Sequence, residues 1–357
     1  MAKKKVVVGM SGGVDSSTAA YLLKKKGYEV VGLFMRTGIH AEGPRRRGCC
    51  SVEDAHDARR VAEHLGIRFY VLNFEKEFEE IIAYFCSEYA RGRTPNPCIL
   101  CNERLKFGKL FEFARTLGAE KVGTGHYARL RSVGRFQLLK GLDPDKDQSY
   151  VLFSLSQEQL AHAVFPVGEF LKKEVRSLAA EAGLRVKDKP DSQEICFVPD
   201  DDYANLVSAR SPKKIPPGEI VDTEGKVLGY HEGIHHFTVG QRRGLALALG
   251  EPKYVIRIEP DSNRVVIGSA KDLLTREFAV TKLNWIAIER LTEPIECLVK
   301  VRSTAKEVEA VLYPEAPDRV VVELIGPLPG AVTPGQAAVF YDGETVLGGG
   351  WIEKRIS

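Results

Sequence analysis

The N-terminal half of the chain alternates short apolar runs with amphipathic stretches. Valine-rich apolar runs occupy residues 5–10, 29–35, 67–74 and 121–128. Stretches with helical spacing and helix-end signals occupy residues 14–27, 51–66, 78–92 and 102–118. Because buried parallel strands are near-continuous apolar runs connected through helices, this pattern predicts an α/β fold with a doubly wound parallel sheet. Ligands of such sheets bind at the carboxyl ends of the strands.

The pattern changes after Val198. A short helix is expected in "PDDDYANLV", followed by the proline-rich linker "SPKKIPPG". Strand-like runs then occupy residues 254–259, 264–269, 319–325 and 337–341, separated by turn sequences such as "PDSN" and "YDGE". Closely spaced strands and turns predict two small β-rich domains, the last of them a β-barrel. We expect domains at residues 1–205, 206–276 and 277–357.

Composition and charge narrow the class of protein. The chain has 357 residues, 44% of them hydrophobic, and a formal net charge of +3. No apolar run is long enough to span a membrane, and "MAKKKVVVG" lacks a signal-peptide core, so a cytoplasmic protein with no membrane partner is expected. The basic clusters "PRRRG", "ARGR" and "GQRRG" are weak candidates for RNA contacts. Seven cysteines, an odd number, argue against a disulfide framework.

The stretch "GMSGGVDSST" lies between the first predicted strand and helix. Backbone N–H groups at such a helix start bind phosphate, and Gly12 and Gly13 allow close approach. Asp15 would repel a phosphate unless a cation intervenes, which suggests Mg²⁺. The Walker motif and the dinucleotide motif G-x-G-x-x-G are both absent. The alternative is a tight turn before a capped helix, but strand, loop and helix together favour phosphate binding.

Two cysteine-bearing stretches are the second feature. In "TPNPCILCNERLKFG", Cys101 stands near the expected start of a helix, where the thiolate is favoured, and Lys106 follows about a turn later. In "KPDSQEICFVPDDDY", Cys196 has mostly polar and acidic neighbours in the sequence, which is unusual for a cysteine buried in a core. The alternative for each is a small buried hydrophobic residue. Cys86 and Cys297 fit that alternative, whereas Cys49 and Cys50 have no predicted role.

The loop resembles the pyrophosphate loop of the ATP pyrophosphatase superfamily, in which AMP is transferred to an oxygen of the substrate. Together with "TGHYAR", "DQSYVLFSL", "GYHEGIHHFTVGQRRGL" and "VTPGQAAVFYDGETVLGGGWI", the cysteine stretches closely resemble the tRNA-specific 2-thiouridylase family nearly end to end. That resemblance implies sulfur placed on C2 of the wobble uridine. It also implies ATP as cofactor and, as partners, tRNAs for Lys, Glu and Gln and a persulfide sulfur donor or relay protein.

The resemblance also assigns site residues. The catalytic positions are Cys101, as nucleophile, and Cys196, as the persulfide carrier. The positions implied for ATP are Gly9, Met10, Ser11, Gly12, Gly13, Val14, Asp15, Ser16, Met35 and Gly125. The positions implied for the target base and tRNA are Asn96, Pro97, Cys98, His126, Lys146, Asp147, Gln148, Arg302, Ser303 and Gln336.

One departure from the family leaves the sulfur chemistry open. Many members carry an acid where this chain has Cys98, which here forms a C-x-x-C motif with Cys101. Cys98, Cys101 and Cys196 suffice as ligands of a [4Fe–4S] cluster with one open iron position, an alternative to the persulfide route. Zinc fits less well, since no convincing fourth ligand is present. More remote alternatives are a pyrophosphate-loop ligase acting on a small molecule and a non-enzymatic RNA-binding protein.

Overall fold

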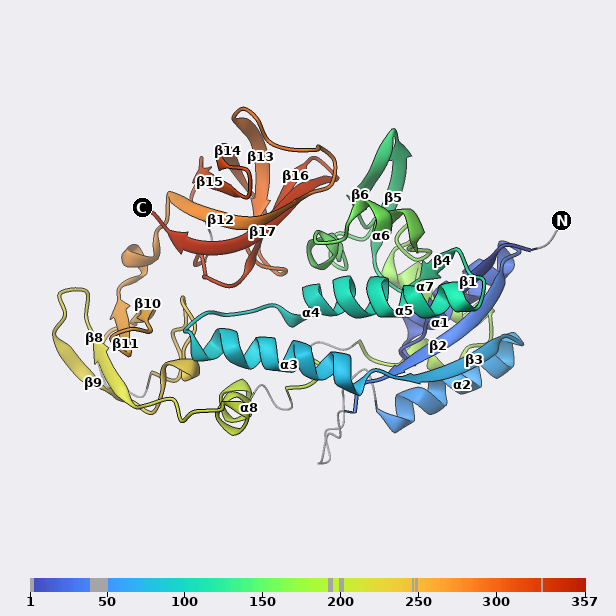
Figure 1. Cartoon of the computed structure of the whole chain (residues 1–357), viewed down its shortest axis with the longest axis horizontal. Helices are drawn as coiled ribbons and strands as arrows, with labels where there is room; N and C mark the ends of the chain where they lie inside the picture. Colours follow the sequence, from blue (N-terminus) through green and yellow to red (C-terminus); the bar gives the residue numbers. More distant parts are fainter. Residues whose placement is uncertain are drawn as a thin grey trace. The chain divides into compact units, whose positions relative to one another are not determined.

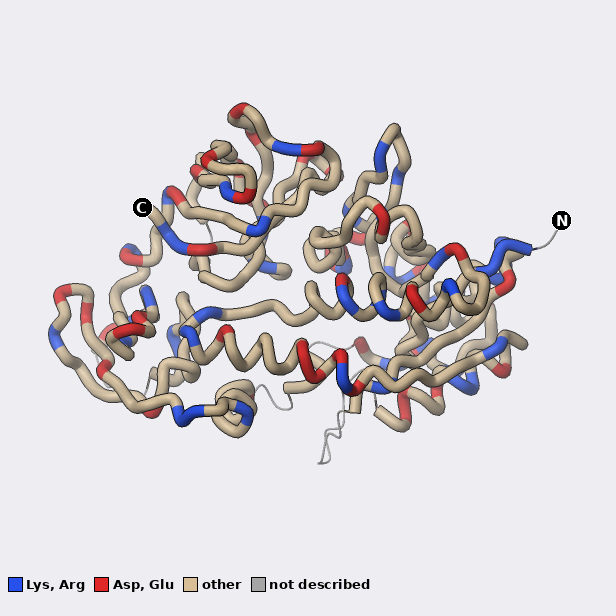
Figure 2. Tube along the Cα trace, in the orientation of Figure 1, with Lys and Arg blue, Asp and Glu red and all other residues tan. Residues whose placement is uncertain are grey.

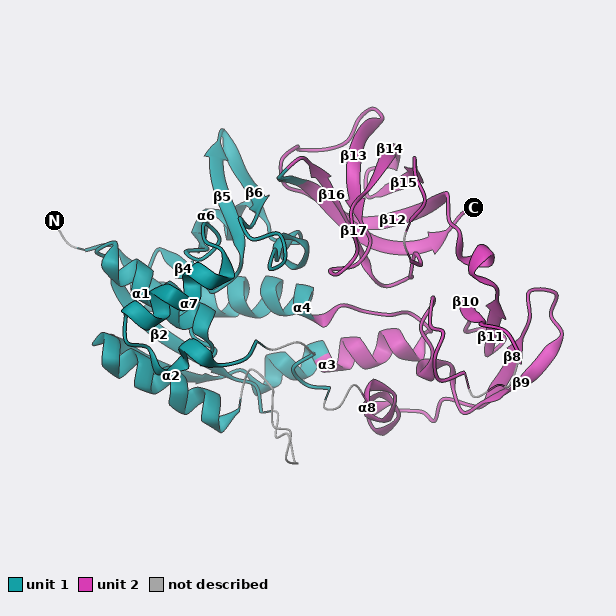
Figure 3. Ribbon diagram, turned by 180° about the vertical axis from the view of Figure 1, so that it is seen from behind, with its two compact units in different colours: residues 1–81, 98–201, 344–346 teal, residues 82–97, 202–343, 347–357 magenta. Residues whose placement is uncertain are grey.

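The computed structural model describes residues 3–38, 51–191, 195–198, 202–245, 247, 250–328 and 330–357. Cys49, Cys50 and the arginines of "PRRRG" lie outside these residues. The chain forms two compact units that are interleaved in sequence (Figure 3). Unit 1 comprises residues 1–81, 98–201 and 344–346, and unit 2 comprises residues 82–97, 202–343 and 347–357. The three-domain division at 1–205, 206–276 and 277–357 stays a prediction.

Unit 1 is built on a parallel sheet with the strand order β3–β2–β1–β4–β7. Figure 1 labels the first four strands of this sheet, β1 to β4. The strands are β1 (Lys5–Gly9), β2 (Glu29–Arg36), β3 (Arg68–Asn73), β4 (Lys121–Gly123) and β7 (Ala163–Val164). Val7 of the central β1 pairs with Val31 on one side and Val122 on the other. The strand order reverses at β1, which is where doubly wound sheets bind ligands. The predicted parallel α/β fold is confirmed.

Helices flank this sheet and supply its core. They are α1 (Val14–Lys25), α2 (Val52–Leu65), α3 (Glu75–Ala90), α4 (Pro97–Leu100), the π segment η1 (Cys101–Lys109), α5 (Leu110–Thr116), α6 (Gln157–His162) and α7 (Lys172–Glu181), with 3₁₀ turns η2 (Ser149–Leu152) and η3 (Arg185–Asp188). Val6, Val8, Leu23 and Val61 form one buried cluster. Each such side chain contributes about 1.5–3 kcal/mol when fully buried.

Two sequence predictions for unit 1 are wrong in detail. The strand expected at 121–128 ends at Gly123, and the chain then forms the hairpin of β5 (Ala128–Val133) and β6 (Arg135–Lys140). The helix expected from Asn102 begins at Pro97. Proline has no N–H to lose at a first helical position, and its fixed φ suits a helix start. Cys101 therefore lies inside a longer helix rather than at its beginning.

Unit 2 contains a small sheet and a closed barrel. The sheet follows the order β10–β11–β8–β9, and the barrel the order β12–β15–β14–β13–β16–β17, closed by pairing of β12 with β17. The elements are α8 (Tyr203–Arg210), β8 (Gly218–Val221), β9 (Val227–His231), η5 (Ile234–His236), β10 (Tyr254–Glu259), β11 (Arg264–Gly268), η6 (Ala270–Leu273), β12 (Glu277–Trp285), β13 (Ile295–Lys300), β14 (Val308–Ala316), β15 (Arg319–Leu324), β16 (Ala337–Asp342) and β17 (Thr345–Arg355). Val255 and Val265 centre the core of the sheet, and Phe278, Val299 and Phe340 that of the barrel. The expected β-rich second half with a terminal barrel is confirmed.

Candidate active site

The loop between β1 and α1 is closed by its own hydroxyl groups. The Ser16 hydroxyl accepts from Ser11 N at 3.1 Å and donates to Gly13 O at 3.3 Å, and Ser17 Oγ donates to the same carbonyl at 2.8 Å. Gly13 is the N-cap of α1 and supplies no side-chain cap. Helix N-terminal N–H groups have no intrahelical acceptor, so this helix start is suited to an anion.

Two glycines bring other segments onto this loop. Gly12 has φ +74°, and a Cβ there would stand 2.3 Å from Asp54 O, at the start of α2. A Cβ on Gly125, in the turn after β4, would stand 2.5 Å from Ser16 N. The structure therefore brings Gly125 to the loop that begins with Gly9, as a member of the expected ATP site should be. Side chains at these positions would fill the space that the backbone groups share.

Some residues of the expected ATP site have side chains that are buried in the core. Met10 is 2% exposed, and Val14 is also buried in the core. A Cβ on Gly32 would stand 2.6 Å from Met10 Sδ, so this side chain packs against β2. These two residues can serve a nucleotide only through their backbone. Met35 is half-buried at the carboxyl end of β2, next to the loop's strand.

Asp15 is held by a cation that sequence reasoning missed. Lys172 Nζ lies 2.8 Å from both carboxylate oxygens of Asp15, and the Tyr127 hydroxyl donates to Oδ1 at 2.8 Å. Burial, reinforced by Asp15, raises the pKa of Tyr127 and keeps it a donor. The ammonium of Lys172 already neutralises Asp15, and the Mg²⁺ suggested by the sequence stays a prediction. The only sequence signal was a lysine in "FLKKEVR".

The run Lys146–Gln148 lies beside the same group of residues. Lys146 Nζ is 2.9 Å from Asp191 Oδ2. Asp147 accepts from Gly141 N at 3.0 Å and Ser149 N at 3.1 Å, and Gln148 Oε1 accepts from Tyr127 N at 3.0 Å. Asp147 and Gln148 thus shape the loop between β6 and η2, and their expected contacts with tRNA stay predictions.

The π segment η1 begins with Cys101. π turns are rare and occur frequently at functional sites. Asn102 is buried, with its Nδ2 donating to Val151 O at 2.9 Å. Further along the segment, Lys106 Nζ lies 3.5 Å from Nε2 of His126, whose Nδ1 lies 2.7 Å from Thr124 Oγ1. Burial and then the charge of Lys106 hold the pKa of His126 well below its usual value.

The cysteines differ in exposure. Cys98 is exposed, and Cys101 and Cys196 are half-buried. Across the residues that the structure describes, no group of three or more His, Cys, Asp and Glu side chains is placed to hold a metal ion. Cys98, Cys101 and Cys196 do not form such a group in this arrangement, and the cluster stays an untested alternative. Cys86 and Cys297 are buried as expected, and burial raises the pKa of Cys297 to about 12.

The remaining candidates for tRNA contact belong to unit 2. Gln336 Nε2 donates to Thr94 O at 2.9 Å, just before Asn96 and Pro97 in the chain. Arg302 Nη2 donates to Thr333 Oγ1 at 2.6 Å and Val239 O at 3.1 Å. Ser303 beside it is exposed. The structure thus brings Gln336 to the segment 94–97 and leaves Ser303 open to solvent.

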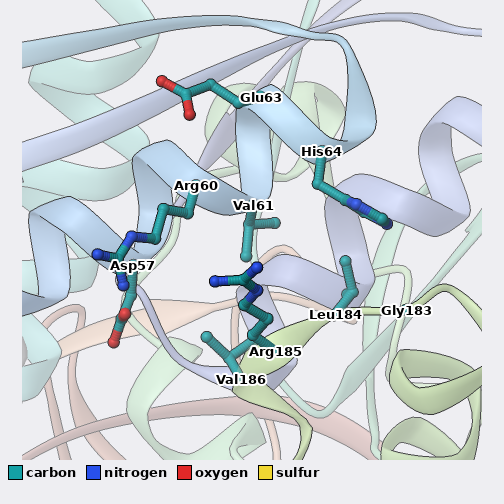
Figure 4. Close-up of a pocket in the computed structure, with 9 residues that line it drawn as sticks. All are labelled: Asp57, Arg60, Val61, Glu63, His64, Gly183, Leu184, Arg185 and Val186. Carbon is teal, nitrogen blue, oxygen red and sulfur yellow. The ribbon is translucent and has the colours of Figure 1, made fainter.

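A separate cavity of about 340 Å³ lies between α2 and the turn that leads into η3 (Figure 4). Its lining is Asp57, Arg60, Val61, Glu63, His64, Gly183, Leu184, Arg185 and Val186. Among the described residues, neither the phosphate loop nor a cysteine contributes to it. This cavity is therefore distinct from the residues that the sequence assigned to chemistry.

Comparison with known proteins agrees with this geometry. The family described as "tRNA methyl transferase HUP domain" matches residues 4–200. A "tRNA methyl transferase PRC-barrel domain" matches residues 204–269, and an "Aminomethyltransferase beta-barrel domain" matches residues 275–352. The parallel sheet and its glycine-rich phosphate loop, with these matches, define a pyrophosphate-loop enzyme of the HUP class that uses ATP.

Curated relatives narrow the class. The chain is 49% identical to tRNA-specific 2-thiouridylase MnmA 1 of Caldanaerobacter subterraneus subsp. tengcongensis over 99% of this chain and 98% of the relative. It is 47% identical to tRNA-specific 2-thiouridylase MnmA of Clostridioides difficile, over 99% of each chain. The chain belongs to the tRNA-specific 2-thiouridylase family, a family of sulfurtransferases.

Charge and hydrophobicity over the whole chain add two facts. Lys and Arg are interspersed with Asp and Glu in both units (Figure 2), in keeping with the small net charge. Among the described residues, no helix combines the length and the apolar character needed to cross a bilayer.

Proposed function

We propose that this protein catalyses ATP-dependent 2-thiolation of the wobble uridine of tRNA. The observation that carries the proposal is the pairing of an uncapped phosphate loop, onto which Gly125 packs, with His126, the next residue, which contacts the helix of Cys101. The relatives' names supply the substrate class. Acceptors of the Lys, Glu and Gln type and a cytoplasmic location, where thiols stay reduced, complete the proposal.

The first half-reaction activates the base. The C2 oxygen of uridine attacks the α phosphate of ATP, the bond to the β phosphate breaks, and pyrophosphate leaves. The helix start and loop N–H groups stabilise the phosphate charge. Asp15 can lie beside phosphates because Lys172 neutralises it. The C2 oxygen can then leave as part of AMP, which is a far better leaving group than the unmodified oxygen.

The second half-reaction delivers sulfur. A donor or relay protein loads Cys196 as a persulfide. The Cys101 thiolate attacks the Cys196 sulfur, the S–S bond breaks, and hydrosulfide is released. Hydrosulfide attacks C2, and AMP leaves with the former C2 oxygen. The resulting Cys101–Cys196 disulfide is reduced by an external dithiol before the next turnover.

Substitution of Cys196 by serine tests the proposal. Cys196→Ser should abolish thiolation of unmodified tRNA while tRNA-dependent release of pyrophosphate persists, because adenylation needs no sulfur. The measurements are thiouridine by mass spectrometry of tRNA digests and pyrophosphate by a coupled assay. Full thiolation by Cys196→Ser with a persulfide donor would contradict the persulfide route.

The exposed Cys98 provides the matched control. Because serine keeps a small polar side chain at this predicted tRNA contact, Cys98→Ser should keep most of the thiolation in protein purified without oxygen and shown to contain no iron. Loss of thiolation, together with stoichiometric iron and sulfide in the wild type, would instead favour the cluster route. Release of pyrophosphate in the absence of RNA would favour a ligase that acts on a small molecule. Absence of pyrophosphate release even when tRNA is present would favour a non-enzymatic RNA-binding protein.

A further inference from the structure

Lys189 and Asp191, which precede Cys196 in the chain, are connected to the phosphate loop. Lys189 Nζ donates to Gly12 O at 3.1 Å and lies 2.6 Å from Asp54 Oδ1 and 2.7 Å from Asp57 Oδ2. Although burial opposes the charge, the two carboxylates raise the pKa of Lys189. Hydrogen bonds between ionised groups are about twice as strong as neutral ones, so three contacts hold this ammonium firmly.

Asp191 makes a second connection to the same loop. Its Oδ1 lies 2.8 Å from Lys172 Nζ and 3.2 Å from Arg176 Nη2, and its Oδ2 lies 2.9 Å from Lys146 Nζ. The Lys172 ammonium also holds Asp15 at 2.8 Å. The ammonium of Lys172 therefore connects Asp191 to Asp15 of the phosphate loop. Lys189 makes a separate connection to the same loop through the Gly12 carbonyl.

The residues that follow Cys196 are held by apolar packing. Phe197 is 5% exposed and Val198 is 4% exposed. The Phe197 ring stands edge-on to Phe78 of α3, with centroids 5.7 Å apart and an interplanar angle of 82°. Cys196 is half-buried. In the chain it follows residues held by ion pairs, Lys189 and Asp191, and precedes residues held by apolar packing, Phe197 and Val198.

We infer that Lys189 is a positioning residue that makes the placement of Cys196 depend on the occupancy of the phosphate loop. The inference builds on the role of Cys196 under the proposed function. Phosphates in the loop add negative charge beside Gly12 and draw the Lys189 ammonium closer. Lys189 is then held more tightly, and Cys196, seven positions later in the chain, reacts more slowly with external reagents. Linkage requires a coupling of this kind to act in both directions.

The test measures alkylation of Cys196 by iodoacetamide, followed by peptide mass spectrometry, with and without an ATP analogue whose α–β bridge is methylene. In the wild type, the analogue should slow alkylation by about fivefold or more, the lower range of measured site couplings. Lys189→Gln should abolish the slowing and raise KM for ATP. Lys189→Arg, which keeps the positive charge, should restore the slowing of alkylation by the analogue. Lys187→Gln, at an exposed lysine two positions earlier, should behave as the wild type.

Two outcomes overturn the inference: an analogue that leaves wild-type alkylation unchanged, or a Lys189→Gln variant that keeps the full slowing. A purely structural role would change the unfolding midpoint but not the response to the analogue. If Lys189→Gln does not fold, Asp191→Asn tests the second connection by the same measurement. Alkylation reports on position and needs no sulfur transfer, so failure of the persulfide proposal in Cys196→Ser is detected separately.

Discussion

At the scale of single residues, Gly125 has no room for a side chain. A Cβ atom there would stand 2.5 Å from Ser16 N and 2.7 Å from the Asp15 carbonyl carbon. Because both atoms belong to the backbone, Gly125→Ala must displace the phosphate loop, at a cost of about 1–3 kcal/mol. We expect a lower free energy of unfolding and weaker ATP binding, measured by denaturant titration and calorimetry.

Gly326→Ala is the matched control for that substitution. The nearest atom to its added Cβ is Val308 Cγ1 at 4.0 Å, an ordinary contact. Stability and ATP affinity should both stay at wild-type values. Unchanged ATP affinity in Gly125→Ala would remove Gly125 from the nucleotide site.

His126 should make stability depend on pH. Burial, with the charge of Lys106, lowers its pKa well below 6.5 in the folded protein. The unfolded chain therefore binds the proton first as pH falls, and stability is lost below the unfolded pKa. The difference in unfolding free energy between wild type and His126→Gln should shrink from about pH 8 to about pH 5, by at most about 1.4 kcal/mol per pH unit. A difference constant over this range would contradict the neutral imidazole.

At the scale of elements, the π segment changes which residues share a face. Its hydrogen bonds run from each residue to the fifth one along, so residues about five apart, such as Cys101 and Lys106, are brought to the same side. In an α-helix, neighbours on one face are three and four apart. The five-residue spacing on the π segment therefore predicts that the Cys101 thiol lies near the Lys106 ammonium, which contacts His126.

Lys106→Met tests this alignment. Removal of the positive charge should lower the thiolate fraction and slow alkylation of Cys101 at neutral pH, on the order of tenfold. The measurement is the rate of Cys101 alkylation as a function of pH. Lys109→Met, at an exposed lysine 2.9 Å from Glu112, is the control and should not change the rate. An equal rate in both variants would show that Lys106 does not act on Cys101.

At the scale of the whole molecule, the charges are interspersed, so individual exposed cations are the candidates for contacts with RNA phosphates. Arg242 and Arg243 are exposed in unit 2. Removing one cation that pairs with a phosphate reduces the slope of log affinity against log salt by about one. The double substitution Arg242→Ser, Arg243→Ser should therefore lower that slope by about two, measured by filter binding of tRNA. Arg257→Ser, at an arginine paired with Glu259 at 2.8 Å, is the control and should leave the slope unchanged.

The sequence by itself determined the features that depend on local pattern. Continuous valine runs identify buried parallel strands, because both faces of such a sheet are covered. The glycine pair and hydroxyls after β1 indicate a phosphate loop, because backbone N–H groups at a helix start can bind an anion. The motif resemblance named the family, and the comparisons confirmed it.

Only the tertiary structure decided how the site is assembled. Lys172 and Asp15 are 157 positions apart, and Lys189 and Gly12 are 177 apart, so no local pattern could pair them. The π turn was equally hidden, since its sequence also suits an α-helix. The neutral state of His126 follows from burial, which the fold alone supplies. Local sequence thus set the elements and the loop, while long-range electrostatics and packing set the partners of each functional group.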